Sequence, residues 1–267
     1  MNDNTWIIKT LWIGPALSTI EQLCIKSFLA HGHRVELFVY DDVQSIPDGT
    51  IVRDGNDILS EEKIFMHRRK SSSTYAAFSD WFRYLMLYKE GGVWIDTDVI
   101  CLKPFNFDTD FFVGLQVQDK AMVNGAVLGS KPGTELMQFA ANQAENPNRF
   151  LPYDSSRVKR RKLRRRFLEG NQRGNIKWSE TGPEGLTKAL QYFDLFHTAL
   201  PFFYFYPIHP SNWKTVFDGS LVDVSRSFPD SYAIHLWNDM MRRDQSFSKD
   251  GPFPKNSLIE DLKRRYS

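Results

Sequence analysis

Two carboxylates separated by one residue, Asp96 and Asp98, come directly after the apolar run Val93-Trp94-Ile95. On an extended segment the side chains of residues i and i+2 lie on the same face, so both can converge on one point. Oxygen ligands at the end of a buried strand suit Mg²⁺ or Mn²⁺, which also bind the oxygens of substrate phosphates. The alternative interpretation is an ordinary turn, because aspartate is common in turns.

A second pair of charges, Asp80 and Arg83, lies in a stretch whose apolar residues surround nearly the whole predicted helix, which indicates a buried helix. At a spacing of i,i+3 the two side chains share one helix face. Two interpretations stay open, because buried charges need a partner or a ligand. The pair either fixes the helix as a structural ion pair, or borders a polar pocket where Arg83 meets a phosphate or a sugar hydroxyl.

The elements that must position these residues follow from hydrophobic periodicity. A strand over 6–14, a helix over 18–31 capped by Ser18, and a strand over 35–40 form a βαβ unit, which predicts a parallel sheet. In such sheets ligands bind at the carboxyl ends of the strands. A helix over 74–90, stopped by Gly91-Gly92, and a strand beginning at Val93 then deliver the two carboxylates to that edge.

The rest of the chain is less regular. Residues 42–73 are polar and contain turn-forming residues, so they predict an irregular segment. Further strands are expected at 111–117 and 126–129, and helices at 134–145, near 184–193 and from 258. The run 157–166 is strongly basic. It is interpreted as a solvated surface, a contact for anionic lipid head groups or, with least support, a nucleic-acid contact.

The overall composition bounds the class of protein. With 267 residues, 42% hydrophobic and 25% charged, the chain is typical of a soluble globular protein, and a net charge of +2 excludes a global nucleic-acid binder. Cys24 and Cys101 match neither a disulfide framework nor a zinc spacing and are expected to be reduced thiols. The N-terminal residues show no secretory signal, so we expect a cytoplasmic protein, free or peripheral on the inner membrane, and favour a secreted effector less.

The combination of Ser79-Asp80-Trp81-Phe82-Arg83-Tyr84, Gly91-Gly92 and Trp94-Ile95-Asp96-Thr97-Asp98 resembles the core signature of the family 32 glycosyltransferases. The large clostridial glucosylating toxins share that catalytic core, and the resemblance covers roughly residues 76–105. It implies an α/β fold with a GT-A-like Rossmann-type mixed sheet flanked by helices. We expect a single domain over 1–267, with a nucleotide-sugar and metal-binding half at about 1–130 and acceptor-side and closing segments at about 131–267.

The resemblance also implies an activity. The expected enzyme is a metal-dependent retaining glycosyltransferase that moves a hexose or N-acetylhexosamine from a nucleotide sugar, expected to be a UDP-sugar, to a glycan, lipid-linked or protein acceptor. By resemblance Asp98 contacts Mn²⁺ or Mg²⁺ directly, Asp96 bridges metal and ribose, and Asp80 and Arg83 hold sugar hydroxyls. A bacterial enzyme of polysaccharide biosynthesis is the expected setting. The competing class is a non-catalytic basic protein that binds a membrane surface or nucleic acid.

Further positions match the family less closely. Trp12, in a segment similar to the family's first strand, is expected to stack on the uracil, although it could equally be a core residue. Asn124 opens a strand similar to one that lines the sugar site, and Thr181-Gly182-Pro183 resembles a turn near the donor, or an ordinary helix start. The remaining expected donor contacts are Trp94, Gly182, Pro183 and Trp237.

A late segment, Ala233-Ile234-His235-Leu236-Trp237-Asn238, resembles the one that closes over the metal and diphosphate in the family. The common form has Ser-Trp a few residues after the histidine, whereas here Trp237 follows His235 by two. The third protein ligand of the metal is therefore either His235 or Asn238. The alternative for His235 is a core residue with satisfied hydrogen bonds.

Overall fold

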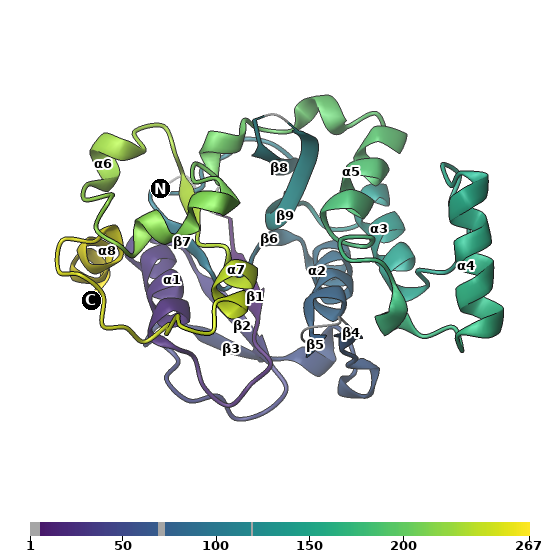
Figure 1. The fold of residues 1–267 in the computed structure, drawn as a ribbon, viewed down its shortest axis with the longest axis horizontal. Helices are drawn as coiled ribbons and strands as arrows, with labels where there is room; N and C mark the ends of the chain where they lie inside the picture. Colours follow the sequence, from purple (N-terminus) through teal and green to yellow (C-terminus); the bar gives the residue numbers. More distant parts are fainter. Residues whose placement is uncertain (1–5, 69–72, 119) are drawn as a thin grey trace.

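The computed structural model describes residues 6–68, 73–118 and 120–267. Its centre is a six-stranded mixed sheet of order β3-β2-β1-β6-β9-β8 (Figure 1). The strands β1 (Ile8–Leu11), β2 (Val35–Val39), β3 (Ile51–Asp54) and β6 (Gly92–Ile95) run parallel, while β9 (Lys120–Ser130) is antiparallel to β6 and to β8 (Phe111–Val117). This arrangement confirms the predicted α/β class with a mixed sheet.

Helices cover both faces of the sheet. Successive side chains of a strand point to opposite faces, so the apolar residues on each face need a layer of helices to bury them. On β6, Val93 and Ile95 point into one apolar core, which α1 (Thr19–Ala30) and α8 (Leu258–Tyr266) complete. Trp94 points into the other core, formed with α2 (Ala76–Glu90), α3 (Glu135–Glu145) and α5 (Pro183–Tyr192). Figure 1 shows these two groups of helices on opposite sides of the strands, with α4 (Ser156–Leu168) at the far edge beyond α5.

The remaining elements are short. They are β4 (His67–Arg68), β5 (Ser73–Thr74), β7 (Val99–Cys101), β10 (Ala233–His235), α6 (Val224–Ser227), α7 (Asn238–Arg243) and six 3₁₀ turns, Gly55–Asp57, Glu61–Lys63, Arg173–Asn175, Phe196–Thr198, Phe202–Tyr204 and Pro210–Val216.

Several predicted bounds were wrong. The strand predicted over 6–14 spans only Ile8–Leu11, and that predicted over 126–129 is the end of the longer β9. The segment 42–73, predicted to be irregular, supplies the outer parallel strand β3. This strand has only four residues, three of them exposed, within a polar stretch of the chain. Residues 69–72 of that segment lie outside the described residues. The basic run forms helix α4, in which Lys162 and Arg165 are buried.

A second, two-stranded sheet joins distant parts of the chain. Strand β7 pairs antiparallel with β10, so that His235 lies opposite Val99. Neither strand was predicted as such, because each has only three residues and depends on its partner for its hydrogen bonds. The pairing brings the late histidine segment against the end of β6. In the described part of the chain, no helix has the length and apolar character needed to cross a membrane; the residues 1–5 considered for a secretory signal are not described.

Candidate active site

The two carboxylates occupy a tight connection between β6 and β7. The backbone N–H of Asp96 donates to the carbonyl of Ala126 on β9 at 2.8 Å, and the N–H of Val99 donates back to the carbonyl of Asp96 at 3.2 Å. The segment is therefore a turn at the carboxyl end of a parallel strand, where ligands bind in such sheets. The two interpretations of Asp96 and Asp98, a metal site and an ordinary turn, are therefore compatible. The turn itself brings the two carboxylates together.

His235 and Asn238 close over Asp98. The Nε2 atom of His235 lies 3.2 Å from Oδ2 of Asp98, and the backbone N–H of Asn238 donates to the same oxygen at 2.6 Å. One ligand atom each of Asp96, Asp98 and His235 lies within 4.8 Å of the others. The structure thus brings together the residues that the sequence predicted as metal ligands.

The chemistry of this cluster fits a divalent cation. It offers two carboxylates and one imidazole, the donor types taken by Mn²⁺ and, for the oxygens, Mg²⁺. The side-chain Oδ1 of Asn238 and Nδ1 of His235 are buried and have no hydrogen-bond partner among the described residues. An unsatisfied buried oxygen beside two carboxylates is costly unless it gains a partner. A cation held by Asp96, Asp98 and the side-chain oxygen of Asn238 would supply that partner, and His235 is the alternative third ligand.

The electrostatics of the Asp98–His235 pair favour the charged forms. Burial raises the pKa of Asp98, but His235 and the N–H of Asn238 outweigh it, so that the pKa lies below its usual value. For His235, burial lowers the pKa and Asp98 raises it by more, so the net shift is upward. The two shifts have one cause, the attraction between the Asp98 carboxylate and the imidazole of His235.

Arg83 joins the helix α2 to the carboxylate turn. Its Nη2 donates to Oδ1 of Asp96 at 2.7 Å, and its Nη1 lies 3.6 Å from Oδ1 of Asp80. The guanidinium also lies over the ring of Trp94, 4.9 Å from its centroid, and Trp94 Nε1 donates to the same Asp96 oxygen at 2.7 Å. Arg83 and Trp94 therefore hold Oδ1 of Asp96, which leaves Oδ2 for a ligand.

The side chain of Asp80, on α2, contacts the segment that begins α5. Its Oδ2 accepts a hydrogen bond from the hydroxyl of Thr181 at 3.0 Å. Burial raises the pKa of Asp80 to about 6, against the opposing effects of Arg83 and Thr181. A β-carbon at Gly182 would lie only 3.0 Å from the same oxygen. Gly182, predicted as a donor contact, thus makes room for Asp80.

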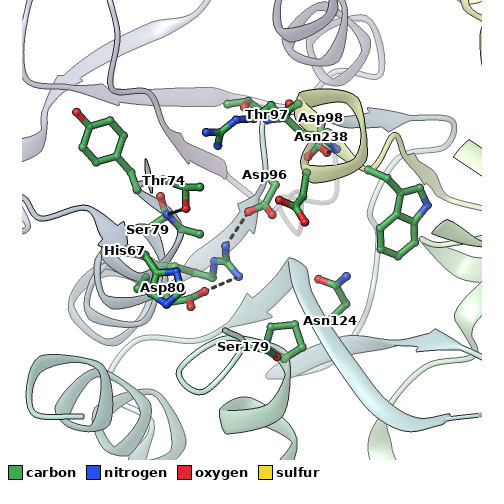
Figure 2. Close-up of a pocket in the computed structure, with 18 of the residues that line it drawn as sticks. His67, Thr74, Ser79, Asp80, Asp96, Thr97, Asp98, Asn124, Ser179 and Asn238 are labelled. Carbon is green, nitrogen blue, oxygen red and sulfur yellow. Dashed lines mark hydrogen bonds and ion pairs between the residues drawn. The ribbon is translucent and has the colours of Figure 1, made fainter. Parts of the chain in front are cut away.

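A single cavity of about 770 Å³ contains these groups. Figure 2 shows Asp96, Asp98 and Asn238 together, with Asp80, His67, Thr74 and Ser79 across from them. The other lining residues predicted from the sequence are Trp12, Arg83, Trp94, Asn124, Pro183, His235 and Trp237.

The aromatic residues of the site differ in accessibility. Trp12 is half-buried at the end of β1, and its buried Nε1 has no hydrogen-bond partner. Trp237 is buried: its Nε1 donates to the carbonyl of Ile208 at 2.8 Å and its ring packs 4.4 Å from that of His235. Trp237 therefore supports His235 from behind, whereas Trp12 remains available to a planar ligand.

Sequence reasoning missed several residues of the site. Tyr206 donates its hydroxyl proton to the carbonyl of Asn124 at 2.8 Å, and the same hydroxyl oxygen accepts from the N–H of Val127 at 3.0 Å, which fixes β9 beside the carboxylates. Trp178, partly exposed, lines the opposite end of the cavity with His67. Lys249 also lines the cavity and forms an ion pair with Glu21. No motif marks these residues, because tertiary contacts alone bring them to the site.

Comparison with known families matches the two halves of this site separately. The family described as a glycosyltransferase sugar-binding region containing the DXD motif matches residues 19–113, which include Asp80, Arg83, Asp96 and Asp98. The family described as an alpha 1,4-glycosyltransferase conserved region matches residues 174–266, which include His235 and Asn238. Both parts of the site thus resemble families of glycosyltransferases. The resemblance seen in the motifs is thereby confirmed.

Among curated relatives, human alpha-1,4-N-acetylglucosaminyltransferase is 25% identical over 254 residues, which are 90% of this chain and 62% of the relative. Rat lactosylceramide 4-alpha-galactosyltransferase is 30% identical over 172 residues, 60% of this chain and 40% of the relative. The chain therefore spans less than two thirds of the length of either relative.

Among solved structures, the glycosyltransferase domain of the YGT toxin aligns with a TM-score of 0.48 at 10% identity, covering 98% of this chain and 94% of that domain. The glycosyltransferase GlyE of Streptococcus pneumoniae aligns with a TM-score of 0.41 at 12% identity, covering 98% of this chain and 60% of that one.

Proposed function

We propose that this protein is a metal-dependent retaining glycosyltransferase that takes a hexose or N-acetylhexosamine from a UDP-sugar. The proposed acceptor is a glycan, a lipid-linked glycan or a protein. The alpha-1,4 transfer named for both curated relatives supports this class of reaction. The competing class, a non-catalytic basic binding protein, leaves the buried cluster of Asp96, Asp98 and His235 without a role.

One observation carries the proposal: the acidic cluster and the Asp80–Arg83 pair open into the same cavity. Departure of UDP places additional negative charge on the diphosphate, and fixed positive charge at that point lowers the barrier. A divalent cation, when bound, supplies that charge and orients the diphosphate. The cavity size lies within the range of about 300–1,000 Å³ usual for small-molecule sites.

The side chains of the protein have separate positioning tasks in this proposal. Asp98 is held by His235 and the N–H of Asn238 as a carboxylate, ready to bind a cation. Arg83 fixes one oxygen of Asp96, and the other oxygen would be free to bind a cation or a ribose hydroxyl. Asp80, restrained by Thr181, accepts a hydrogen bond from a sugar hydroxyl. Groups fixed before the substrate arrives need no reorganisation during the reaction.

The acceptor is proposed to enter at the opposite end of the cavity, over Trp178. This ring is 37% exposed and packs against the ring of His67, 5.4 Å away. His67 is itself fixed by a 2.9 Å contact between its Nε2 and the carbonyl of Ile176. An exposed, rigid aromatic ring offers a flat apolar surface to the face of a pyranose.

The test is hydrolysis of a panel of UDP- and GDP-sugars with and without Mn²⁺. We expect turnover with a UDP-sugar that requires the metal, and loss of turnover in Asp98→Asn. Asp230→Asn, which changes an exposed carboxylate outside the cavity, is the matched control. Absence of turnover for every donor, together with no metal- and UDP-dependent rise in Tm, would contradict the proposal.

A further inference from the structure

The helix α4 has two faces with different chemistry. On its inner face Lys162 donates to the carbonyl of Arg149 at 2.9 Å and to Asp154 at 2.8 Å, and Arg165 donates two hydrogen bonds to Glu180 at 3.0 and 2.6 Å. These two residues are buried and neutralised by acids of the protein. They therefore belong to the fold, although the sequence presents them as part of one continuous basic run.

The α4 outer face consists of six exposed residues at helical spacing, Arg157, Arg160, Leu163, Arg164, Phe167 and Leu168. Among the described residues no acidic side chain pairs with Arg157 or Arg160, while Arg164 forms an exposed pair with Glu169 at 3.0 Å. Of the three apolar side chains, Phe167 is 72% exposed, Leu168 80% and Leu163 37%. Figure 1 places this helix at the edge of the molecule, with nothing beyond it.

Exposed apolar side chains and unpaired arginines on one helix face suit a particular partner. A bilayer with anionic lipids accepts both, because the apolar side chains enter the acyl boundary while the arginines contact the head groups. A nucleic acid would bind the arginines through its phosphates and leave Leu163, Phe167 and Leu168 in water. We infer that the α4 outer face docks this protein on an anionic lipid bilayer.

The inner face of α4 links such docking to the candidate active site. Arg165 holds Glu180, and the next residue, Thr181, donates to Asp80 in the cavity. Residues Ile176 to Ser179, which follow the end of α4 after one 3₁₀ turn, line the same cavity. Given the proposed function, docking through α4 favours a lipid-linked acceptor among the three acceptor classes.

The docking is tested by sedimentation of the protein with phosphatidylcholine vesicles, with and without phosphatidylserine. We expect binding only to the anionic vesicles, weakened by salt. The variant Arg157→Ser/Arg160→Ser should bind about fivefold more weakly for each arginine removed. The variant Phe167→Ser/Leu168→Ser should also lose vesicle binding, but should bind duplex DNA as the unchanged protein does.

Matched controls lie on α8, at the opposite end of the molecule (Figure 1). The variant Arg264→Ser/Arg265→Ser removes the same charge there and should sediment as the unchanged protein does. Equal binding to neutral and anionic vesicles would overturn the inference. So would full vesicle binding by Phe167→Ser/Leu168→Ser, which would indicate a surface for polyanions only. Sedimentation needs no donor, and hydrolysis of a soluble UDP-sugar by the same variants reports separately on the proposed function.

Discussion

Arg83 on the buried helix α2 donates a 2.7 Å hydrogen bond to Asp96 in the turn after β6, 13 residues further along the chain. The same guanidinium lies 3.6 Å from Asp80, so one guanidinium contacts two carboxylates. The two interpretations of the Asp80–Arg83 pair are therefore compatible. The pair is a structural ion pair, and what it fixes is the first carboxylate of the candidate metal site.

Removal of Arg83 should destabilise the fold as well as the site. Arg83→Ala leaves Asp80 and Asp96 with uncompensated charge, and breaking a buried pair in this way costs about 3–5 kcal/mol. Chemical denaturation measures the loss. Arg34→Ala, which removes an exposed partner of Glu36, should cost less than about 1 kcal/mol. Equal losses in the two variants would show that the Arg83 contacts are not a buried network.

Substitutions of Asn238 can separate the contribution of its side chain to cation binding from that of its backbone N–H. The N–H to Asp98 is present in any variant, whereas the unsatisfied Oδ1 is lost in Asn238→Ala and retained as an oxygen donor in Asn238→Asp. We expect Asn238→Ala to weaken Mn²⁺ binding by about 10- to 100-fold, the range for groups around a metal site. Asn238→Asp should bind at least as tightly as the unchanged protein. Calorimetric titration with Mn²⁺ measures these affinities. An unchanged affinity of Asn238→Ala for Mn²⁺ would leave His235 as the third ligand.

The raised pKa of Asp80 makes stability depend on pH. Its pKa of about 6 lies above the value of 3.8 for the free side chain, so the folded state binds the proton more tightly than the unfolded state. The stabilisation is thus complete below about pH 4 and is lost as the pH rises through 6, a change of roughly 3 kcal/mol. Asp80→Asn cannot titrate, so its free energy of unfolding relative to the unchanged protein should rise over this interval. Parallel pH profiles of the two proteins would contradict the prediction.

Gly125 provides the space for the guanidinium. A β-carbon at this position would lie 2.5 Å from Nη1 of Arg83, so Gly125→Ala should displace Arg83 and weaken UDP-sugar binding. The effect should disappear when Arg83 is already absent, because the clash is then relieved. A double-mutant cycle of Gly125→Ala and Arg83→Ala measures this coupling. Additive effects would mean that the alanine acts elsewhere on β9.

Trp178 provides a test of the acceptor end alone. Trp178→Ala should raise the KM for the acceptor by about two- to tenfold, equivalent to roughly 0.5–1.5 kcal/mol of ring contact. Hydrolysis of the donor by water should stay unchanged, since the ring of Trp178 packs against His67, which Figure 2 shows across from Asp96 and Asp98. Trp178→Phe keeps a flat ring and should retain most of the acceptor affinity. A parallel fall in donor hydrolysis would place the ring on the donor side instead.

The part of the site that lies on continuous segments could be predicted from the sequence. Asp80 and Arg83 lie on a helix, and Asp96 and Asp98 lie in the turn directly after a strand. The periodicity of both elements is clear, so their edge of the sheet follows from position alone. The late segment was found through its resemblance, but its contact with Asp98 depends on the three-residue pairing of β7 with β10. Such short strands form only in the folded protein, and no local sequence pattern predicts them.

Other parts could not be predicted for a related reason. Helix α4 is basic in sequence, yet only tertiary contacts decide that Lys162 and Arg165 face inward while Arg157 and Arg160 face outward. Trp178 lines the cavity and Tyr206 contacts the backbone of β9, and both lie in irregular segments without periodicity. The proposed division into a donor half and an acceptor half stays a prediction.

The hydrogen bond from Asn238 to Asp98 spans 140 residues of chain. During synthesis the carboxylate turn leaves the ribosome long before β10 and α7 exist, so a growing chain presents Asp96 and Asp98 without the residues that close over them. The proposed binding of a cation then becomes possible only after β10 and α7 have been synthesised. An incomplete chain that stops before Ala233 keeps the DXD motif but lacks the closing segment, and it should be unable to consume nucleotide sugar.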